Sequence, residues 1–271
     1  MSRPSRPPDH VIGYTLVTPS SWHLIFIHGF LGCPKDWQAV VCELPEAWTW
    51  EAVTLPGHGA VLAESEDVME QMVNTVRRAL ASAPVSRRVA MVGYSLGGRV
   101  LLHALRQGLS APDALVLCST SAGLSNPEVR SSRLEKDRQW AMVMDDWPWF
   151  LEAWYRQPLF ESLQQHPQAR EILRENRGAM AACAADLAKL IVACSPGQVP
   201  ACGPALAAVA DRTLMISGEL DHPYTSQLRH APHLYPGIIT RTVPDAGHAV
   251  HLECPVVLAS LITEFLGKEQ P

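Results

Sequence analysis

The stretch that decides the fold is MVGYSLGGRV, at residues 91–100. An apolar run over 88–94 ends at Ser95, and glycines stand two residues before and after that serine, at Gly93 and Gly97. A G-x-S-x-G sequence between a strand and a helix forms a turn so tight that only glycine fits beside it, and the turn exposes the serine hydroxyl at the strand end. It also directs the first amides of the following helix toward that hydroxyl. The stretch therefore predicts a buried strand, a helix from about residue 96 and a nucleophilic serine between them.

The same alternation of strand and helix continues along the chain. Short runs of β-branched and aliphatic residues alternate with longer helix-like segments, as in a mostly parallel sheet flanked by helices. Several runs are apolar at consecutive positions, which is typical of strands covered on both faces. The predicted strands span 23–29, 49–55, 88–94, 113–119, 212–218 and 238–244. The predicted helices span 35–44, 66–83, 96–108, 224–232 and 253–267.

About ninety residues between the fourth and fifth predicted strands contain no strand-like run. They are rich in helix formers and tryptophan, and they end in the proline- and glycine-bearing sequence SPGQVPACGP. This pattern predicts a helical cap at 124–204, inserted into an α/β core formed by 1–123 and 205–271.

Composition limits the classes of partner. The 271 residues are 47% hydrophobic, enough for one large domain with a substantial core, and the net charge is −5. Both signs of charge are scattered, so the chain lacks the basic face that nucleic acid or an anionic membrane would need. No apolar run reaches the roughly 18 residues of a membrane-spanning helix. Residues 1–13 have no continuous apolar segment and predict a short flexible tail rather than a signal peptide.

The cysteines and histidines indicate neither disulfides nor a metal site. Seven cysteines form an odd, widely spread set without a C-x-x-C pair, which predicts reduced thiols and a cytoplasmic protein. The histidines lack metal-ligand spacing, and GYSLGGR lacks the spacing and the lysine of a phosphate loop. We therefore expect no metal and no cofactor.

A serine hydroxyl is a weak nucleophile unless an imidazole accepts its proton, and that imidazole needs a carboxylate to fix its tautomer. When the serine follows a strand in this way, the carboxylate and then the histidine come later in the chain, each after a strand. Asp221 follows the strand at 212–218, and His248 follows the strand at 238–244. With Ser95 they predict the catalytic triad of an α/β-hydrolase fold.

Other residues compete for two of these positions. His251 lies near the start of the last predicted helix, and we interpret it as a surface or packing residue. Glu219 and Asp245 would each have to bend back to reach the imidazole of His248. Asp221 and His248 are therefore preferred.

The sequence IHGFLG at the end of the first predicted strand completes the predicted site. A backbone N–H from this loop and the N–H after the serine bind a developing oxyanion in this architecture, which assigns Phe30 and Leu96 as donors. His28 in this motif and His58 in LPGHG could act as bases, but we interpret both as residues that hold their loops.

Further motifs extend over residues 28 to 255. They are HGFLG followed by Trp37, LPGHG, GYSLGGR, GL followed by EVRSSRLEKDRQWA, WYRQPLF, LRENRG, SGELD and GHAVHLECP. In these motifs the chain resembles 2-succinyl-6-hydroxy-2,4-cyclohexadiene-1-carboxylate (SHCHC) synthase, the enzyme family called MenH. The arginine after the serine turn, the E-x-R-x-x-R-x-x-x-D run and WYRQPLF are the most specific of them.

The resemblance implies a lyase of menaquinone or phylloquinone biosynthesis. Members of the family eliminate pyruvate from 2-succinyl-5-enolpyruvyl-6-hydroxy-3-cyclohexene-1-carboxylate. It implies that Ser95, activated by His248, removes a proton α to the substrate ketone, and that the oxyanion hole holds the enolate. The expected partner is thus a small polycarboxylate; the sequence indicates no oligomeric state.

The resemblance also assigns substrate-binding residues, which are Arg99, Arg133, Arg174, Tyr94 and Trp154. Arginine suits a polycarboxylate because its planar guanidinium pairs with a carboxylate through two hydrogen bonds. Arg99 lies one helical turn after Ser95, with a surface ion pair as its alternative role.

Three of these assignments have rivals. Arg133 could instead pair with Asp137 four residues later, and Arg177 is a rival of Arg174. Trp154 could be cap core rather than a pocket residue.

Two other functions remain open. A serine hydrolase acting on an ester, thioester or C–C bond would form an acyl-enzyme at Ser95, whereas the lyase needs no covalent adduct. A non-catalytic sensor would bind a ligand saturably without turnover.

Overall fold

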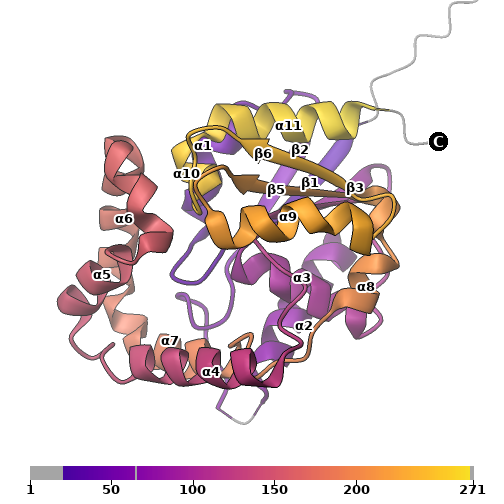
Figure 1. Cartoon of the computed structure of the whole chain (residues 1–271). Coiled ribbons are helices and arrows are strands. Elements are labelled where there is room, and N and C mark those ends of the chain that lie inside the picture. The colour runs from indigo at the N-terminus through magenta and orange to yellow at the C-terminus, as the bar shows by residue number, and fades with distance from the viewer. Residues whose placement is uncertain (1–20, 65, 269–271) are drawn as a thin grey trace, which may run out of the picture.

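The computed structural model describes residues 21–64 and 66–268 (Figure 1). Six parallel strands form one sheet in the order β2-β1-β3-β4-β5-β6. The strands are β1 Trp22–Ile27, β2 Thr49–Val53, β3 Arg88–Tyr94, β4 Ala114–Cys118, β5 Thr213–Gly218 and β6 Ile239–Val243. All six were predicted, and the predicted α/β class is confirmed. The predicted N-terminal tail at 1–13 lies outside the described residues.

Helices cover both faces of the sheet because each strand carries apolar residues on both sides. In β1, Leu24 and Phe26 face a core layer beneath α1 and α11, whereas Ile25 and Ile27 face a second layer beneath α2, α3 and α9. Figure 1 shows α11 on one side of the sheet and α3 and α9 on the other. The helices of this core are α1 Gln38–Val41, α2 Val68–Ser82, α3 Leu96–Arg106, α8 Gly203–Ala207, α9 His222–Leu234, α10 Val250–Glu253 and α11 Pro255–Gly267.

Two predicted helices are shorter or broken in the structure. The segment predicted as a helix at 35–44 forms a 3-10 turn, η1 Pro34–Trp37, followed by α1. The segment predicted at 253–267 divides at Cys254 into α10 and α11. Pro255 has no N–H to continue α10, so it begins a new helix instead.

The segment between β4 and β5 contains helices and no strand among the described residues. Its helices are α4 Pro127–Ala141, α5 Trp147–Tyr155, α6 Pro167–Gly178 and α7 Ala184–Ala193, and its 3-10 turns include η2 Pro158–Gln165 and η3 Ala179–Cys183. These elements fall within the interval predicted as a cap. The predicted boundary at residue 204 cuts α8, whose Leu206 packs in the core layer beneath α3. A last 3-10 turn, η4 Ala210–Arg212, leads into β5.

The strand order positions the site. From β1 the chain crosses to β2 on one side, and from β3 it crosses to β4 on the other, so the loops after β1 and β3 separate at their carboxyl ends. Such a switch point leaves a crevice where ligands bind in open α/β sheets. Figure 1 shows the cap helices α4 to α7 placed around this edge. Among the described helices, none has the length and apolar character needed to cross a membrane.

Candidate active site

Ser95 occupies a strained turn between β3 and α3. Its backbone has φ 48°, a region rare for residues other than glycine. A Cβ on Gly93 would lie 2.7 Å from the backbone nitrogen of Gly98, and one on Gly97 would overlap the carbonyl oxygen of Ile27. The two flanking glycines are therefore required by close packing against α3 and β1, and the strain at Ser95 is held by the surrounding structure.

The structure brings the three predicted triad residues together. His248 Nε2 lies 3.2 Å from Ser95 Oγ, and His248 Nδ1 lies 2.9 Å from Asp221 Oδ2. Asp221 and His248 are almost fully buried. With Nδ1–H donating to the carboxylate, Nε2 is free to accept the serine proton, as nucleophile or base activation requires. Glu219 and Asp245, the rival carboxylates, are exposed to solvent.

Aromatic rings enclose the imidazole of His248. The ring centroids of Tyr94, Phe160 and Tyr224 lie 5.3, 5.7 and 4.9 Å from it. Phe160 comes from the cap, so the cap helps to shield the base from water. Tyr224 was not among the predicted site residues, because nothing in its local sequence shows that α9 turns this ring onto the histidine.

His251 is a packing residue, one of the two roles expected for it. It is buried, with its ring centroid 4.9 Å from that of Trp37 and 4.2 Å from that of Tyr94. Burial lowers the pKa of its imidazole to about 3. No described residue hydrogen-bonds to either ring nitrogen. His251 therefore stays neutral and does not replace His248.

The predicted oxyanion donors lie at the same cavity. Phe30 and Leu96 both line it, and neither backbone N–H has an acceptor among the described residues. Leu31, next to Phe30, has φ 62°, so the loop after β1 is strained as well. The arrangement can stabilise negative charge on a substrate oxygen beside Ser95.

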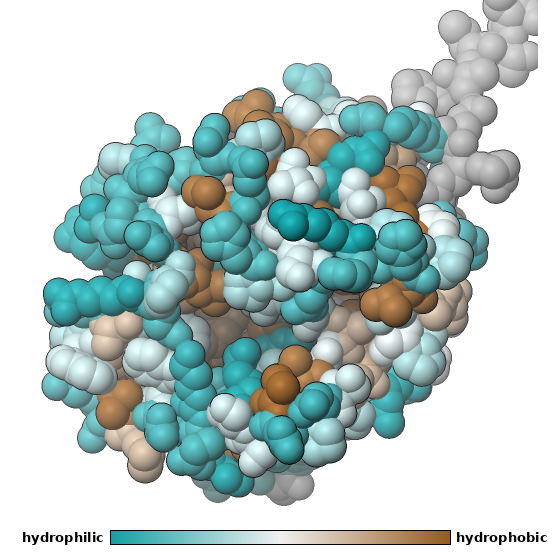
Figure 2. Space-filling model, viewed as in Figure 1, coloured by the Kyte–Doolittle hydropathy of each residue, from teal (hydrophilic) through white to brown (hydrophobic). Residues whose placement is uncertain are grey.

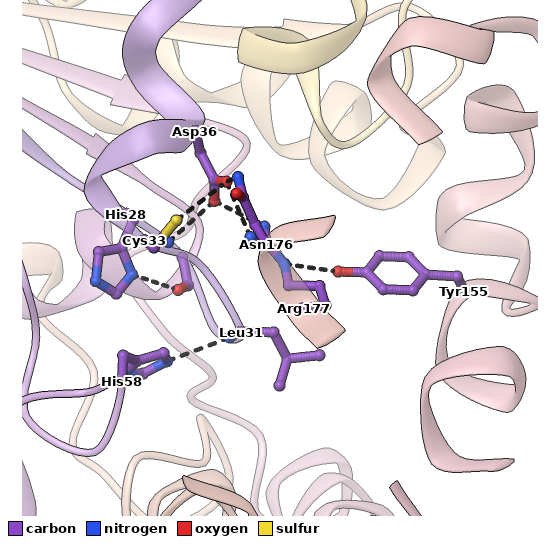
Figure 3. Close-up of polar contacts among 9 residues, drawn as sticks. His28, Leu31, Cys33, Asp36, His58, Tyr155, Asn176 and Arg177 are labelled. Carbon is purple, nitrogen blue, oxygen red and sulfur yellow. Dashed lines mark hydrogen bonds and ion pairs between the residues drawn. The ribbon is translucent and has the colours of Figure 1, made fainter. Parts of the chain in front are cut away.

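Two buried histidines lock this loop to the loop after β2. His28 donates from Nδ1 to the carbonyl oxygen of Gly29 at 2.8 Å and accepts the N–H of Leu55 at 3.1 Å. His58 accepts the N–H of Leu31 at 3.2 Å (Figure 3). Burial lowers the pKa of His28 to about 4 and that of His58 well below its usual range, so both rings stay neutral and able to accept. The loop-holding role predicted for both histidines fits these bonds.

A cavity of about 500 Å³ lies between the core and the cap and contains Ser95 and His248 in its wall. Figure 2 shows the hollow in the middle of the view, with apolar side chains inside and hydrophilic residues around its rim. Tyr94 lines it from β3. Trp154 lines it from α5 and is also packed against Phe30, with ring centroids 5.3 Å apart, so it serves both the cap core and the cavity wall.

Arg99 and Arg133 both reach this cavity. The Arg99 guanidinium donates to the carbonyl oxygen of Cys194 on the cap, and no carboxylate of the described chain pairs with it. Burial lowers the pKa of Arg99. The alternative pair of Arg133 is formed, because its Nε donates to both oxygens of Asp137 at 3.0 and 2.9 Å. The terminal nitrogens of Arg133 have no acceptor among residues 21–64 and 66–268, which leaves them for an anionic ligand.

The assignment of Arg174 to the cavity is wrong. Its side chain is 78% exposed and lies 3.8 Å from Glu171 on the surface of α6. Its rival Arg177 is the buried residue that lines the cavity. One helical step of about 100° separates Arg174 from the inward-facing Leu173, whereas Arg177 returns to that face.

Arg177 is held by a buried network that joins the cap to the core (Figure 3). Its Nη1 and Nη2 donate to the two oxygens of Asp36 at 2.9 and 2.7 Å, and its Nε donates to the Tyr155 hydroxyl at 3.2 Å. Burial would raise the pKa of Asp36, but Arg177 outweighs it and holds that pKa well below its usual range. Arg177 is therefore already neutralised, and it offers a ligand less charge than Arg99 does.

Among the described residues, no group of three or more histidine, cysteine or acidic side chains is arranged to hold a metal ion.

The sequence of this chain is similar to a family model and to proteins of known name. A family model described as "Alpha/beta hydrolase family" matches residues 24–261. SHCHC synthase from Serratia proteamaculans (strain 568) is 32% identical over 250 residues, which cover 90% of this chain and 92% of the relative. SHCHC synthase from Escherichia coli O157:H7 (strain EC4115 / EHEC) is 34% identical over 249 residues, covering 88% and 91%.

Solved structures also superimpose on most of this chain. MenH from S. aureus superimposes with a TM-score of 0.85 at 25% identity, covering 94% of this chain and 97% of the other. A thermophilic esterase from Thermogutta terrifontis has a TM-score of 0.71 at 22% identity, covering 94% and 92%, and shares the fold alone.

Proposed function

Because the chain belongs to the SHCHC synthase family of α/β hydrolases, we propose that it eliminates pyruvate from 2-succinyl-5-enolpyruvyl-6-hydroxy-3-cyclohexene-1-carboxylate in menaquinone or phylloquinone biosynthesis. The product is SHCHC. The observation that carries the proposal is that guanidinium groups of Arg99 and Arg133 line the same cavity as Ser95 and His248. This is the wall that a substrate with several carboxylates requires.

Catalysis begins with proton transfer. His248, oriented by Asp221, accepts the hydroxyl proton of Ser95, and the serine oxygen removes the proton on the ring carbon next to the succinyl ketone. The electron pair of the broken C–H bond moves onto the ketone oxygen and gives an enolate. The N–H groups of Phe30 and Leu96 stabilise that oxygen.

Collapse of the enolate completes the reaction. A new ring double bond forms at the deprotonated carbon, the existing double bond shifts by one position, and the C–O bond to the enolpyruvyl group breaks. Enolpyruvate leaves and becomes pyruvate by taking a proton. Arg99 and Arg133 hold the carboxylates so that the acidic C–H faces Ser95, which supplies the orientation that the step needs.

The direct test supplies the purified protein with the enolpyruvyl intermediate and follows pyruvate by coupled lactate dehydrogenase. Multiple turnovers of pyruvate release, strongly slowed in Arg99→Ala at the same substrate concentration, are the expected result. If the protein releases no pyruvate above background and hydrolyses simple esters well, the lyase proposal fails. Rapid turnover also excludes a sensor that binds without reacting.

A serine hydrolase is the second candidate, because the unaltered triad also suits acyl transfer. It predicts a covalent acyl adduct on Ser95 during turnover, visible as a mass increase of the intact protein. The lyase predicts unmodified protein under the same conditions. Ser95→Ala inactivates both reactions and does not separate them.

The proposal places the protein in the cytoplasm with a small polycarboxylate as its partner. All seven cysteines are unpaired, as is usual for a reducing compartment. Cell fractionation with activity measured in each fraction tests the location.

A further inference from the structure

We propose that Glu253 is a positioning residue that fixes the backbone of the His248 loop and links it to the cap. The inference rests on the role of His248 as the base in the proposed function. The Glu253 carboxylate accepts the N–H of Gly247 at 2.8 Å through Oε2 and the N–H of Ala249 at 2.9 Å through Oε1. These two residues stand on either side of the base in the sequence.

The His248 loop is also held at Ala246, whose carbonyl oxygen accepts the N–H of Leu220 at 2.9 Å. It follows β6 with a positive φ of 56° at Asp245 and then enters α10, which is only one turn long. Asp221 orients the imidazole but does not hold its backbone. Two charge-assisted hydrogen bonds to one carboxylate fix the peptide groups on both sides of His248, and such bonds are about twice as strong as neutral ones. A shift of about 1 Å in a catalytic group costs on the order of 100-fold in rate.

Burial makes this carboxylate unusual. The Glu253 side chain has no exposed area, and no lysine or arginine of the described chain pairs with it. A buried carboxylate is costly unless hydrogen bonds compensate it. The two N–H groups of the His248 loop supply that compensation, so the loop and the carboxylate stabilise each other.

The cap packs against the same loop from the other side. A Cβ on Gly247 would overlap Ser162 Oγ of η2, so this side chain of the cap is in direct contact with the backbone of the loop. His166, at the start of α6, places its Nε2 3.8 Å from Glu253 Oε2. Ala249 belongs to a buried cluster that includes Phe160 of the cap. The position of the base is thus set jointly by Glu253 and by the seated cap.

The charge of Glu253 also reaches the active site. Burial raises the pKa of the Tyr94 hydroxyl well above its usual range, and the negative charges of Asp221 and Glu253 add to that shift.

The test is Glu253→Gln, which keeps the shape and removes the charge and one acceptor oxygen. We expect kcat to fall about 10- to 100-fold while KM stays within twofold, because the base is displaced and the substrate-binding wall is not. Glu264→Gln is the matched control, because Glu264 is an exposed carboxylate on α11. The inference is overturned if Glu253→Gln keeps the wild-type kcat, or if its activity falls only in proportion to unfolded protein.

A second variant and a second assay complete the test. If Glu253→Gln does not fold, Glu253→Asp replaces it: this variant keeps the charge but is one methylene shorter. Reduced kcat with KM within twofold of wild type then supports the inference, and unchanged kcat overturns it. All variants are measured for pyruvate release and for hydrolysis of a simple ester. Loss of pyruvate release in the wild type would end the proposed function, while the ester reaction, which also needs His248, would still test Glu253.

Discussion

Replacing Arg99 with alanine tests whether this side chain binds the substrate, apart from any effect on the free energy of unfolding. The Arg99 guanidinium lies in the cavity wall one helical turn from Ser95 and donates to the carbonyl oxygen of Cys194. No carboxylate of the described chain neutralises it. In the free protein the charge is therefore partly desolvated without a counter-ion, and burial lowers its pKa. A substrate carboxylate would supply the missing partner.

The size of the effect follows from that geometry. Truncating one partner of a buried, hydrogen-bonded charge pair costs about 2–5 kcal/mol. Arg99 is half-buried, which places it toward the lower end, at about 2–3 kcal/mol. Since about 1.4 kcal/mol is a tenfold change, kcat/KM should fall about 30- to 150-fold. The free energy of unfolding should fall by less than about 1 kcal/mol, because the variant also removes an uncompensated buried charge.

Steady-state pyruvate release and urea denaturation of the same preparation measure both quantities. Arg156→Ala is the control: Arg156 is an exposed cap arginine paired with Glu152, and its loss should leave kcat/KM unchanged within twofold. If Arg99→Ala keeps kcat/KM within threefold of wild type, or loses activity only through unfolding, Arg99 does not bind substrate.

Three further changes test other parts of the site. Asp221→Asn should lower kcat about 10⁴-fold, because it leaves the catalytic imidazole in the wrong tautomer, while a thermal melt stays close to wild type. His58→Ala removes the acceptor of the Leu31 N–H and should lower the free energy of unfolding in urea by about 1–3 kcal/mol, together with kcat, because the oxyanion loop loosens. Asp36→Asn leaves Arg177 without its charge partner and should destabilise the protein by about 3–5 kcal/mol at pH 7. Because the folded pKa of Asp36 is lowered, its stabilisation is full above the unfolded value of about 4 and is lost as pH falls toward the folded value, so urea melts of wild type and Asp36→Asn should converge at low pH.

Each of these has an outcome that contradicts it. Wild-type activity in Asp221→Asn would mean that His248 needs no carboxylate. An unchanged kcat in a destabilised His58→Ala would show that the hydrogen bond from Leu31 to His58 contributes to stability and not to catalysis. If the difference in the free energy of unfolding between wild type and Asp36→Asn is the same at every pH, the Asp36 carboxyl titrates alike in the folded and unfolded states.

The strands and the serine turn were predictable because their signals are local. Strands covered on both faces need consecutive apolar residues, and the turn at Ser95 needs glycine on both sides. The positions of Asp221 and His248 were also predictable, because a parallel sheet brings the carboxyl ends of its strands to one edge. Such arguments require only the order of elements along the chain.

The cap residues were harder to place because their positions depend on helix rotation. Arg174 and Arg177 are three residues apart in one short motif, and the sequence left both as candidates. The choice depends on which face of α6 packs inward, and only the position of Leu173 in the assembled cap decides it. The partner of Arg177 lies 141 residues away at Asp36, and no pattern near either residue indicates the other.

The choice between hydrolysis and elimination lies in the cavity wall rather than in the triad. Ser95, His248 and Asp221 can activate the serine for attack on an acyl carbon or for removal of a proton, since both begin with the same proton transfer. Hydrolysis further needs a water molecule delivered to an acyl-enzyme, whereas elimination needs only that a C–H bond be held against the serine oxygen. Three aromatic rings enclose the imidazole of His248, and the guanidinium groups of Arg99 and Arg133 line the cavity, where the proposed function has them bind the substrate carboxylates. Phe160 and Arg133 come from the cap, whereas Tyr94, Tyr224 and Arg99 come from the core. A change of reaction within this fold therefore requires a change of the cavity wall rather than of the triad.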